Sequence, residues 1–197
     1  MTDFTSTLLQ VVAAYRGQGS ARPTSETVVN ALLQAEKAAK QQRLTYPLES
    51  LLGKWQLCFA TGTKKARQRG GIILGKGLYV PKFVAVQISF SATLDQNATK
   101  GDIGNQVQLG PLLLQLTGPA QYLGKKNLLA FDFNYLLLSL FGRMVYNQPI
   151  RSGKVQTEDF YDQSIAKLPF FAFFLVTEDC IAARGRGGGL ALWIREN

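Results

Sequence analysis

The sequence predicts a mainly β protein, an antiparallel β-barrel preceded by a pair of helices. From Leu51 onward, short segments rich in Phe, Val, Ile, Leu and Tyr are separated by glycine or polar turns, with no helical pattern between them. Closely spaced strands of this kind are typical of an antiparallel barrel or sandwich. Before residue 50, the apolar residues recur at helical spacing instead. The β part, residues 51–197, is long enough for an up-and-down barrel that holds one small ligand.

Two helices are expected to open the chain. The first begins with Thr2 or Asp3 as its cap, and the second begins at 23–26, where Pro-Thr-Ser-Glu is a typical helix start. Their apolar stripes are Phe4, Leu8, Val11, Val12 and Tyr15, then Val28, Ala31, Leu32, Ala35, Ala38 and Ala39. We expect residues 1–48 to pack on a barrel formed by residues 49–197, so that the chain is a single domain.

The predicted strands follow one another along the rest of the chain. They cover 55–61, 71–74, 78–80, 83–91, 106–109, 112–117, 127–138, 153–156, 170–177, 179–183 and 189–195. In 128–133 and 170–176 apolar residues occupy both faces of the strand. The outer face is therefore covered as well, and the two helices are a better candidate for that cover than lipid or a partner protein.

The composition argues against catalysis. The chain contains no histidine, which excludes a Ser–His–Asp centre and His-ligated zinc or haem. Its two cysteines, Cys58 and Cys180, are too few for a four-thiolate metal site, and we expect them to be free thiols. We therefore expect a binding protein that is not an enzyme and has no catalytic residue, metal or cofactor.

Positive charge is concentrated in one stretch. The chain has 22 Lys and Arg against 13 Asp and Glu, a net charge of +9, and no acid lies between Glu49 and Asp95. Within this stretch, the basic cluster is Lys64, Lys65, Arg67 and Arg69. Such a cluster can face an anionic membrane, touch the phosphates of RNA, or be a solvated loop. We take it as a candidate membrane-facing surface.

Large aromatic side chains fall on the predicted strands. The candidate lining of the barrel interior is Trp55, Phe59, Phe90, Phe131, Phe133, Tyr135, Phe171 and Phe173. Most aromatic residues in strands simply fill a core. If they surround a cavity instead, it is apolar and suits an isoprenoid, quinone, carotenoid or acyl chain.

The string of arginine and glycine at 184–189 is the most distinctive motif. Hairpin chemistry explains the glycines, which tolerate positive φ. Arg184 and Arg186 either pair with Glu178 or Asp179 or face an anionic ligand group at the barrel rim. Structural pairing is the favoured interpretation.

Two segments together resemble the plastid lipid-associated protein (fibrillin) family. Leu51–Thr61, Leu-Leu-Gly-Lys-Trp-Gln-Leu-Cys-Phe-Ala-Thr, is similar to the family's opening strand. Thr177–Leu190, an acidic start leading into Arg-Gly and a final apolar strand, is similar to its closing hairpin. The chain departs from the family at Thr177, Ile181 and Phe59 and in its triple glycine, so the resemblance is to a divergent, cyanobacterial-type member.

The resemblance implies a lipocalin-like barrel that binds small hydrophobic molecules at the thylakoid membrane and helps protect photosynthetic membranes. The N-terminus lacks a signal peptide pattern, so we expect a peripheral protein on the cytoplasmic side of that membrane, or a cytoplasmic one. The expected partners are a hydrophobic small molecule, an anionic membrane surface and a protein of photosynthesis or isoprenoid synthesis. Two alternatives stay open: a bilin-binding, lipocalin-like chromophore lyase or chaperone, and an RNA-binding module. We expect nucleic acid to be the weaker candidate.

Overall fold

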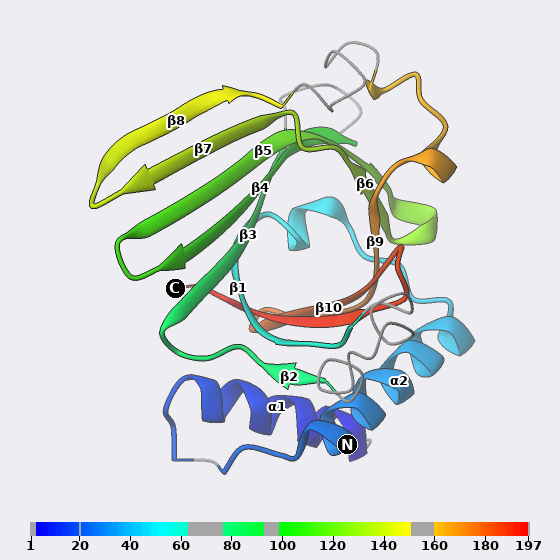
Figure 1. Ribbon diagram of the computed structural model, residues 1–197. Coiled ribbons are helices and arrows are strands. Elements are labelled where there is room, and N and C mark those ends of the chain that lie inside the picture. The colour runs from blue at the N-terminus through cyan, green and yellow to red at the C-terminus, as the bar shows by residue number, and fades with distance from the viewer. Residues whose placement is uncertain (1–2, 20, 63–76, 93–98, 151–159, 197) are drawn as a thin grey trace.

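The computed structural model describes residues 3–19, 21–62, 77–92, 99–150 and 160–196 (Figure 1). Two helices, α1 (Asp3–Tyr15) and α2 (Ser25–Gln42), precede one antiparallel sheet. Its strands, as far as the chain is described, are β1 (Gly53–Ala60), β2 (Leu78–Tyr79), β3 (Val84–Ala92), β4 (Lys100–Leu109), β5 (Leu112–Leu123), β6 (Leu128–Phe131), β7 (Tyr135–Leu140), β8 (Arg143–Pro149), β9 (Phe170–Val176), β10 (Cys180–Gly185) and β11 (Leu190–Arg195).

Eight of the described strands close into a barrel. Around the barrel they follow chain order: β1, β3, β4, β5, β6, β9, β10 and β11, with β11 pairing back onto β1. Each connection joins neighbouring strands, so every backbone ladder is antiparallel and no barrel edge is left open. The predicted up-and-down barrel with an N-terminal helical pair is confirmed.

Strand β5 pairs with two different strands along its length. Its second part, Ala120–Leu123, pairs with β6 inside the barrel, whereas Leu112–Thr117 pairs with β7, and β7 pairs with β8. The first halves of β3 and β5, the second half of β4, and β7 and β8 therefore project beyond the barrel (Figure 1). We call this part the extended sheet.

The prediction of one strand over 127–138 is wrong, and the strand β8 was not expected. Residues 132–134 leave the sheet between β6 and β7, and their amides still bond to β5, from Asp132 N to Pro119 O at 3.1 Å. The chain passes so close to Gly118 that a Cβ there would lie 2.0 Å from Asp132 O. Glycine at this position therefore leaves room for the irregular link between β6 and β7, which both pair with β5.

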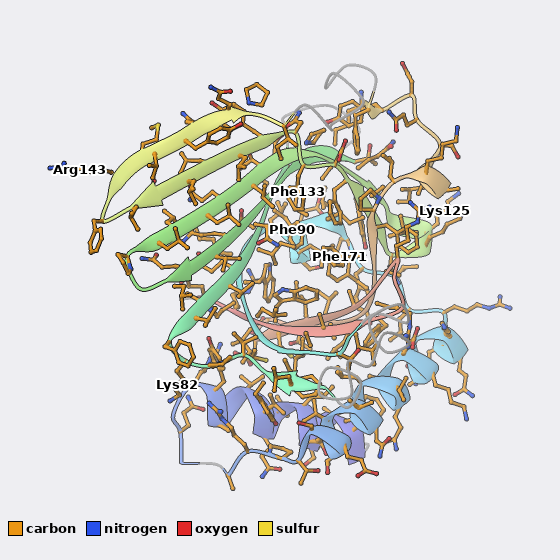
Figure 2. All side chains as sticks on the ribbon, viewed as in Figure 1. Lys82, Phe90, Lys125, Phe133, Arg143 and Phe171 are labelled. Carbon is orange, nitrogen blue, oxygen red and sulfur yellow. The ribbon has the colours of Figure 1, made fainter. Side chains whose placement is uncertain are left out.

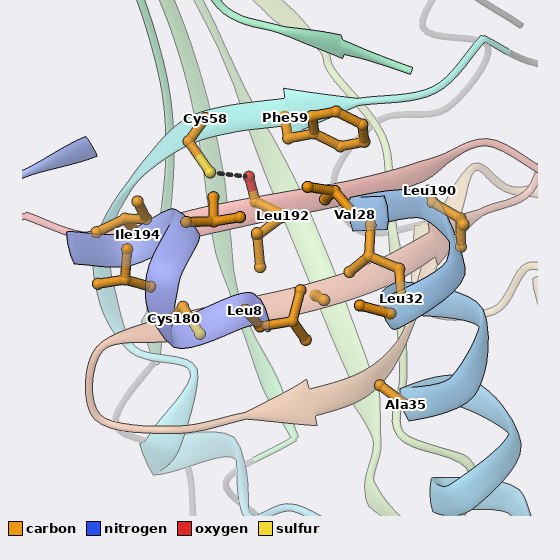
Figure 3. Packing of buried hydrophobic residues seen from close by; sticks show 14 of the residues in the cluster. Leu8, Val28, Leu32, Ala35, Cys58, Phe59, Cys180, Leu190, Leu192 and Ile194 are labelled. Atoms are coloured by element: carbon orange, nitrogen blue, oxygen red, sulfur yellow. Dashed lines mark hydrogen bonds between the residues drawn. The ribbon is translucent and has the colours of Figure 1, made fainter. Parts of the chain in front are cut away.

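The two helices cover one side of the barrel's outer face, over β1, β9, β10 and β11. Thr24 caps α2, since its Oγ1 accepts a hydrogen bond from the amide of Thr27 at 3.2 Å. Leu8 of α1 and Leu32 of α2 are buried against the strands, among residues such as Leu192 (Figure 3). Phe174 of β9 lies in this cluster, so cover by the helices is confirmed for 170–176. The outward Ala130 of β6 is covered instead by Phe160 and Leu168, so the expectation does not hold for 128–133.

One end of the barrel is closed by the chain between α2 and β1. Leu48, in the 3-10 turn η1 (Leu48–Ser50), and Leu51 are buried in the interior cluster. Trp55 Nε1 donates to Leu51 O at 2.7 Å, and Tyr122 Oη donates to Tyr46 O at 2.8 Å. The second helix thus ends at Gln42, before the expected boundary at residue 48, and Leu48 and Leu51 are already part of the barrel core.

Candidate ligand-binding site

The barrel interior holds most of the predicted aromatic residues. Trp55, Phe90, Phe131 and Phe173 are buried there, and Phe133 and Phe171 pack against them. The rings contact one another: the centroids of Phe131 and Phe171 lie 5.0 Å apart and those of Phe90 and Phe173 lie 6.0 Å apart. Figure 2 labels Phe90, Phe133 and Phe171 among the side chains inside the barrel. These side chains form a packed core toward the closed end of the barrel.

Phe59 is the first correction to the predicted interior. It is fully buried, but in the cluster beneath α1 and α2, next to Cys58 (Figure 3). A bulge between Leu57 and Phe59 places one extra residue in β1 and reverses which face the following side chain occupies. Regular alternation of side chains along the strand from Trp55 predicted that Phe59 faces the barrel interior. The apolar pattern of the sequence does not reveal the bulge that changes this.

Tyr135 is the second correction. It is 37% exposed and stands opposite Thr117 on the extended sheet. Thr117 in turn pairs with Gly104, and these positions lie on the outer face, since the next residues along β4 and β5, Ile103 and Gly118, pair on the inner face. Tyr135 therefore lies outside the barrel on the solvent side.

The extended sheet carries an apolar face that continues the barrel interior. Residues directly opposite each other in neighbouring strands share one face of a sheet. Val86 pairs with Val107, Val107 with Leu114, and Leu114 with Leu138. By the same register, this inner face consists of Val84, Val86, Val107, Leu109, Leu112, Leu114, Leu116, Leu136, Leu138, Leu140 and Tyr146, with Asn105, Gln148 and Arg143 as polar members.

The inner face is only half covered. Leu114, Leu116 and Leu138 are half-buried, and exposure rises along the strands to 47% at Leu109. On the barrel side the same rows run into the buried Ile88 and Ile103. The face is thus an open apolar surface that leads into the core.

The opposite face of the extended sheet is more polar, although Leu113, Leu137 and Tyr135 also lie on it. Gln87, Gln106 and Gln115 form a cross-strand row, and Gln115 Nε2 donates to Gln106 Oε1 at 2.7 Å. Together with Ser89 and Thr117 they line a shallow hollow of about 180 Å³. Water can solvate this side, so the apolar side is the one that needs a cover.

Arg184 and Arg186 make structural contacts, as favoured, but with other partners than expected. Arg184 Nε donates to Glu36 Oε1 at 2.8 Å, and the pair joins β10 to α2. Hydrogen bonds from Arg184 lower the pKa of the Glu36 carboxyl below its ordinary value. Arg186 Nη1 donates to Lys167 O at 2.6 Å. Glu178 and Asp179 are not their partners among these contacts.

Some predicted residues lie outside the described part of the chain. These are the basic cluster Lys64, Lys65, Arg67 and Arg69, and the predicted strands 71–74 and 153–156. Within the described ranges no group of three or more His, Cys, Asp or Glu could hold a metal ion. Both cysteines are free and buried, and burial raises the pKa of each thiol. No described helix has the length and apolar character needed to cross a membrane.

The inner face of the extended sheet was not predicted from the sequence. In 112–114 and 136–138 three leucines follow one another, so the period-2 alternation that marks a one-sided strand is hidden. Only the register distinguishes Leu114 on the inner face from Leu113 on the outer one.

No family model, no curated protein and no solved structure matches this chain.

Proposed function

We propose that this protein binds small hydrophobic molecules and acts as a carrier or scaffold for them without catalysing a reaction. One observation carries the proposal: an apolar sheet face, continuous with the barrel core, is left half open to solvent. The ligand class is an elongated isoprenoid, carotenoid, quinone or lipid, because such a chain can lie along the rows of Val and Leu.

The energetics support a ligand on this face. Each CH₂ group that leaves water contributes roughly 0.8 kcal/mol. A ligand chain that lies over Leu114 and Leu138 would remove both its own CH₂ groups and these half-exposed side chains from water. Both contributions favour binding. Since the extended sheet stands beside the barrel, a ligand can reach the face without opening the packed aromatic core.

The resemblance to the fibrillin family supplies the proposed setting. We place the protein at the thylakoid membrane of a cyanobacterial-type cell, peripheral on the cytoplasmic side, with a role in photoprotection and a partner in photosynthesis or isoprenoid synthesis. The bilin alternative relied on Arg184 and Arg186, and the described contacts engage these arginines with Glu36 and backbone carbonyls. The RNA alternative relied on them and on the basic cluster at 64–69, which lies outside the described residues. We therefore keep hydrophobic-ligand binding as the proposal.

A fluorescence titration tests the proposal. The two tryptophans, Trp55 and Trp193, belong to the interior cluster, and quenching by an added isoprenoid quinone reports binding near it. Leu114→Asn places an amide on the inner face and is expected to weaken quinone binding about tenfold. Leu113→Asn, one residue away on the outer face, is the matched control and should bind like the original protein. Equal binding by both variants, or no quenching in the original protein, would refute the proposal.

A further inference from the structure

Three turns of the extended sheet end along one edge of the molecule. The last paired row of the sheet links Val84 to Leu109, Leu109 to Leu112, Leu112 to Leu140, and Leu140 to Arg143. Just beyond this row lie Phe83, the turn 110–111 and the turn 141–142. With neighbouring strands about 4.8 Å apart, this edge is roughly 19 Å wide. We call it the tip edge.

Large apolar side chains are unusually exposed at the tip edge. Phe141 is 78% exposed, Phe83 73%, Val145 62% and Met144 61%. Scattered exposed leucines are ordinary, and α2 has one in Leu33 at 44%. Phe141, Met144 and Val145 lie together in and beside the turn between β7 and β8, and Phe83 lies at the β3 end of the same edge, with the exposed Leu109 and Leu112 between them. Exposed apolar patches of this kind mark an interaction site.

The charges at the tip edge have one sign. Lys82 precedes Phe83 and Arg143 follows the turn 141–142, and both lie at the same side of the molecule in Figure 2. The described residues 77–92, 103–131 and 133–150 contain no Asp or Glu. Asp102 is near the opposite end of β4, seven residues from Leu109, and Glu196 bonds to Gln87, three residues behind the row.

We propose that the tip edge docks on an anionic lipid bilayer, with Phe141, Phe83 and Met144 inserted at the boundary between headgroups and acyl chains. Lys82 and Arg143 flank these side chains and would meet the anionic headgroups. Apolar residues on projecting turns suit shallow insertion of about 5–10 Å. A flat protein surface would instead leave the gaps between the three turns unfilled.

Docking by this edge gives the proposed carrier a direct route for its ligand. The inner face begins at the row from Val84 to Leu140, which lies immediately behind the inserted side chains. An apolar chain can pass from the bilayer onto Leu114 and Leu138 without crossing water. This part of the inference rests on the proposed function, whereas the docking itself does not.

Co-sedimentation with vesicles tests the docking. The probe is the full chain with vesicles of phosphatidylglycerol and phosphatidylcholine, compared with phosphatidylcholine alone. Phe141→Ser is expected to weaken vesicle binding about tenfold, because one fully inserted phenyl group contributes at least that factor. Leu33→Ser removes an exposed leucine from α2, on the helical side of the molecule, and should bind as the original protein does.

A charge variant measures the electrostatic contribution to vesicle binding separately from the contribution of apolar insertion. Arg143→Gln is expected to weaken binding to the anionic vesicles about fivefold and to leave binding to phosphatidylcholine unchanged. Vesicle binding by Phe141→Ser equal to that of the original protein overturns the inference. A second outcome also overturns it: the original protein is a dimer in solution, Phe141→Ser is monomeric, and vesicle binding persists. In that case the apolar patch is the contact between two copies of the chain.

The quinone titration distinguishes this inference from the proposed function. If Phe141→Ser loses vesicle binding but quinone still quenches its fluorescence in vesicle-free buffer, the result supports membrane docking and is consistent with the proposed carrier function. Vesicle binding that depends on Phe141, without any quinone quenching, supports docking and refutes the carrier.

Discussion

The barrel wall beneath the helices and the extended sheet are made of similar apolar strands but are covered differently. Strand β10 has Ile181 facing the interior and Ala182 facing the helices, and both are fully buried. Strand β7 has Leu138 on the inner face and Leu137 on the outer face, and both are only half-buried. This difference indicates that the barrel wall, buried on both faces, contributes most of the stability. The extended sheet, which nothing in the described structure fully covers, keeps apolar surface available for binding.

The largest effect is expected in the wall. Trp55→Ala should lower the free energy of unfolding by about 3–5 kcal/mol, because it empties a fully buried site. It also removes the hydrogen bond to Leu51 O and the stacking of Arg195, whose Cζ lies 3.9 Å from the ring centroid. Urea unfolding followed by circular dichroism measures the loss. A loss below about 1 kcal/mol would contradict a packed interior.

The contact between wall and helices is expected to contribute less. Glu36→Gln should cost about 1–2 kcal/mol at pH 7, since it removes the charge that Arg184 and Lys40 face. The lowered pKa of Glu36 means that its carboxylate stabilises the fold above the ordinary pKa of 4.5, and this contribution is lost as the pH falls through the folded-state pKa.

The pH dependence provides the check on this pair. Unfolding free energies from pH 7 to pH 3 should fall less steeply for Glu36→Gln than for the original protein. Lys40→Gln is the control, because Lys40 is 75% exposed and its pair with Glu36 contributes only about 0.3 kcal/mol. Identical pH profiles for the Glu36→Gln variant and the original protein would exclude Glu36 as a stabilising carboxylate.

On the extended sheet, Leu138→Ala should cost only about 1 kcal/mol, because the side chain is half-buried and leaves no closed cavity. The same urea experiment measures it, and the quinone titration should show weaker binding. A cost comparable to that of Trp55→Ala would mean that the inner face is as tightly packed as the barrel.

The smallest effect on stability is expected at the tip edge. Phe141→Ser should change the free energy of unfolding by less than about 0.5 kcal/mol, since the ring is 78% exposed. A thermal melt of the purified variant checks this. Destabilisation by more than about 1 kcal/mol would show that the ring packs on the protein in solution.

Local patterns were sufficient for much of the fold. The helices, the start of the second helix within 23–26, the chain-order barrel and the interior positions of Trp55 and Phe90 follow from periodicity and turn residues. Other features depend on residues distant in sequence. The bulge that turns Phe59 outward and the partner of Arg184, 148 residues away, leave no local signal. Glu36 appeared to lie off the apolar stripe, yet it is buried because Arg184 meets it there.

The sequence by itself determined which catalytic chemistry is excluded and which segments form helices and strands. Without histidine it excludes histidine-based catalysis, and its apolar segments separated by turns specify antiparallel strands around a core. Only the tertiary structure decided which apolar faces are covered. Alternation gives each strand two faces, but strand pairing and helix docking decide which face meets the core, which meets α1 and α2, and which stays open, because these contacts join residues far apart in the chain.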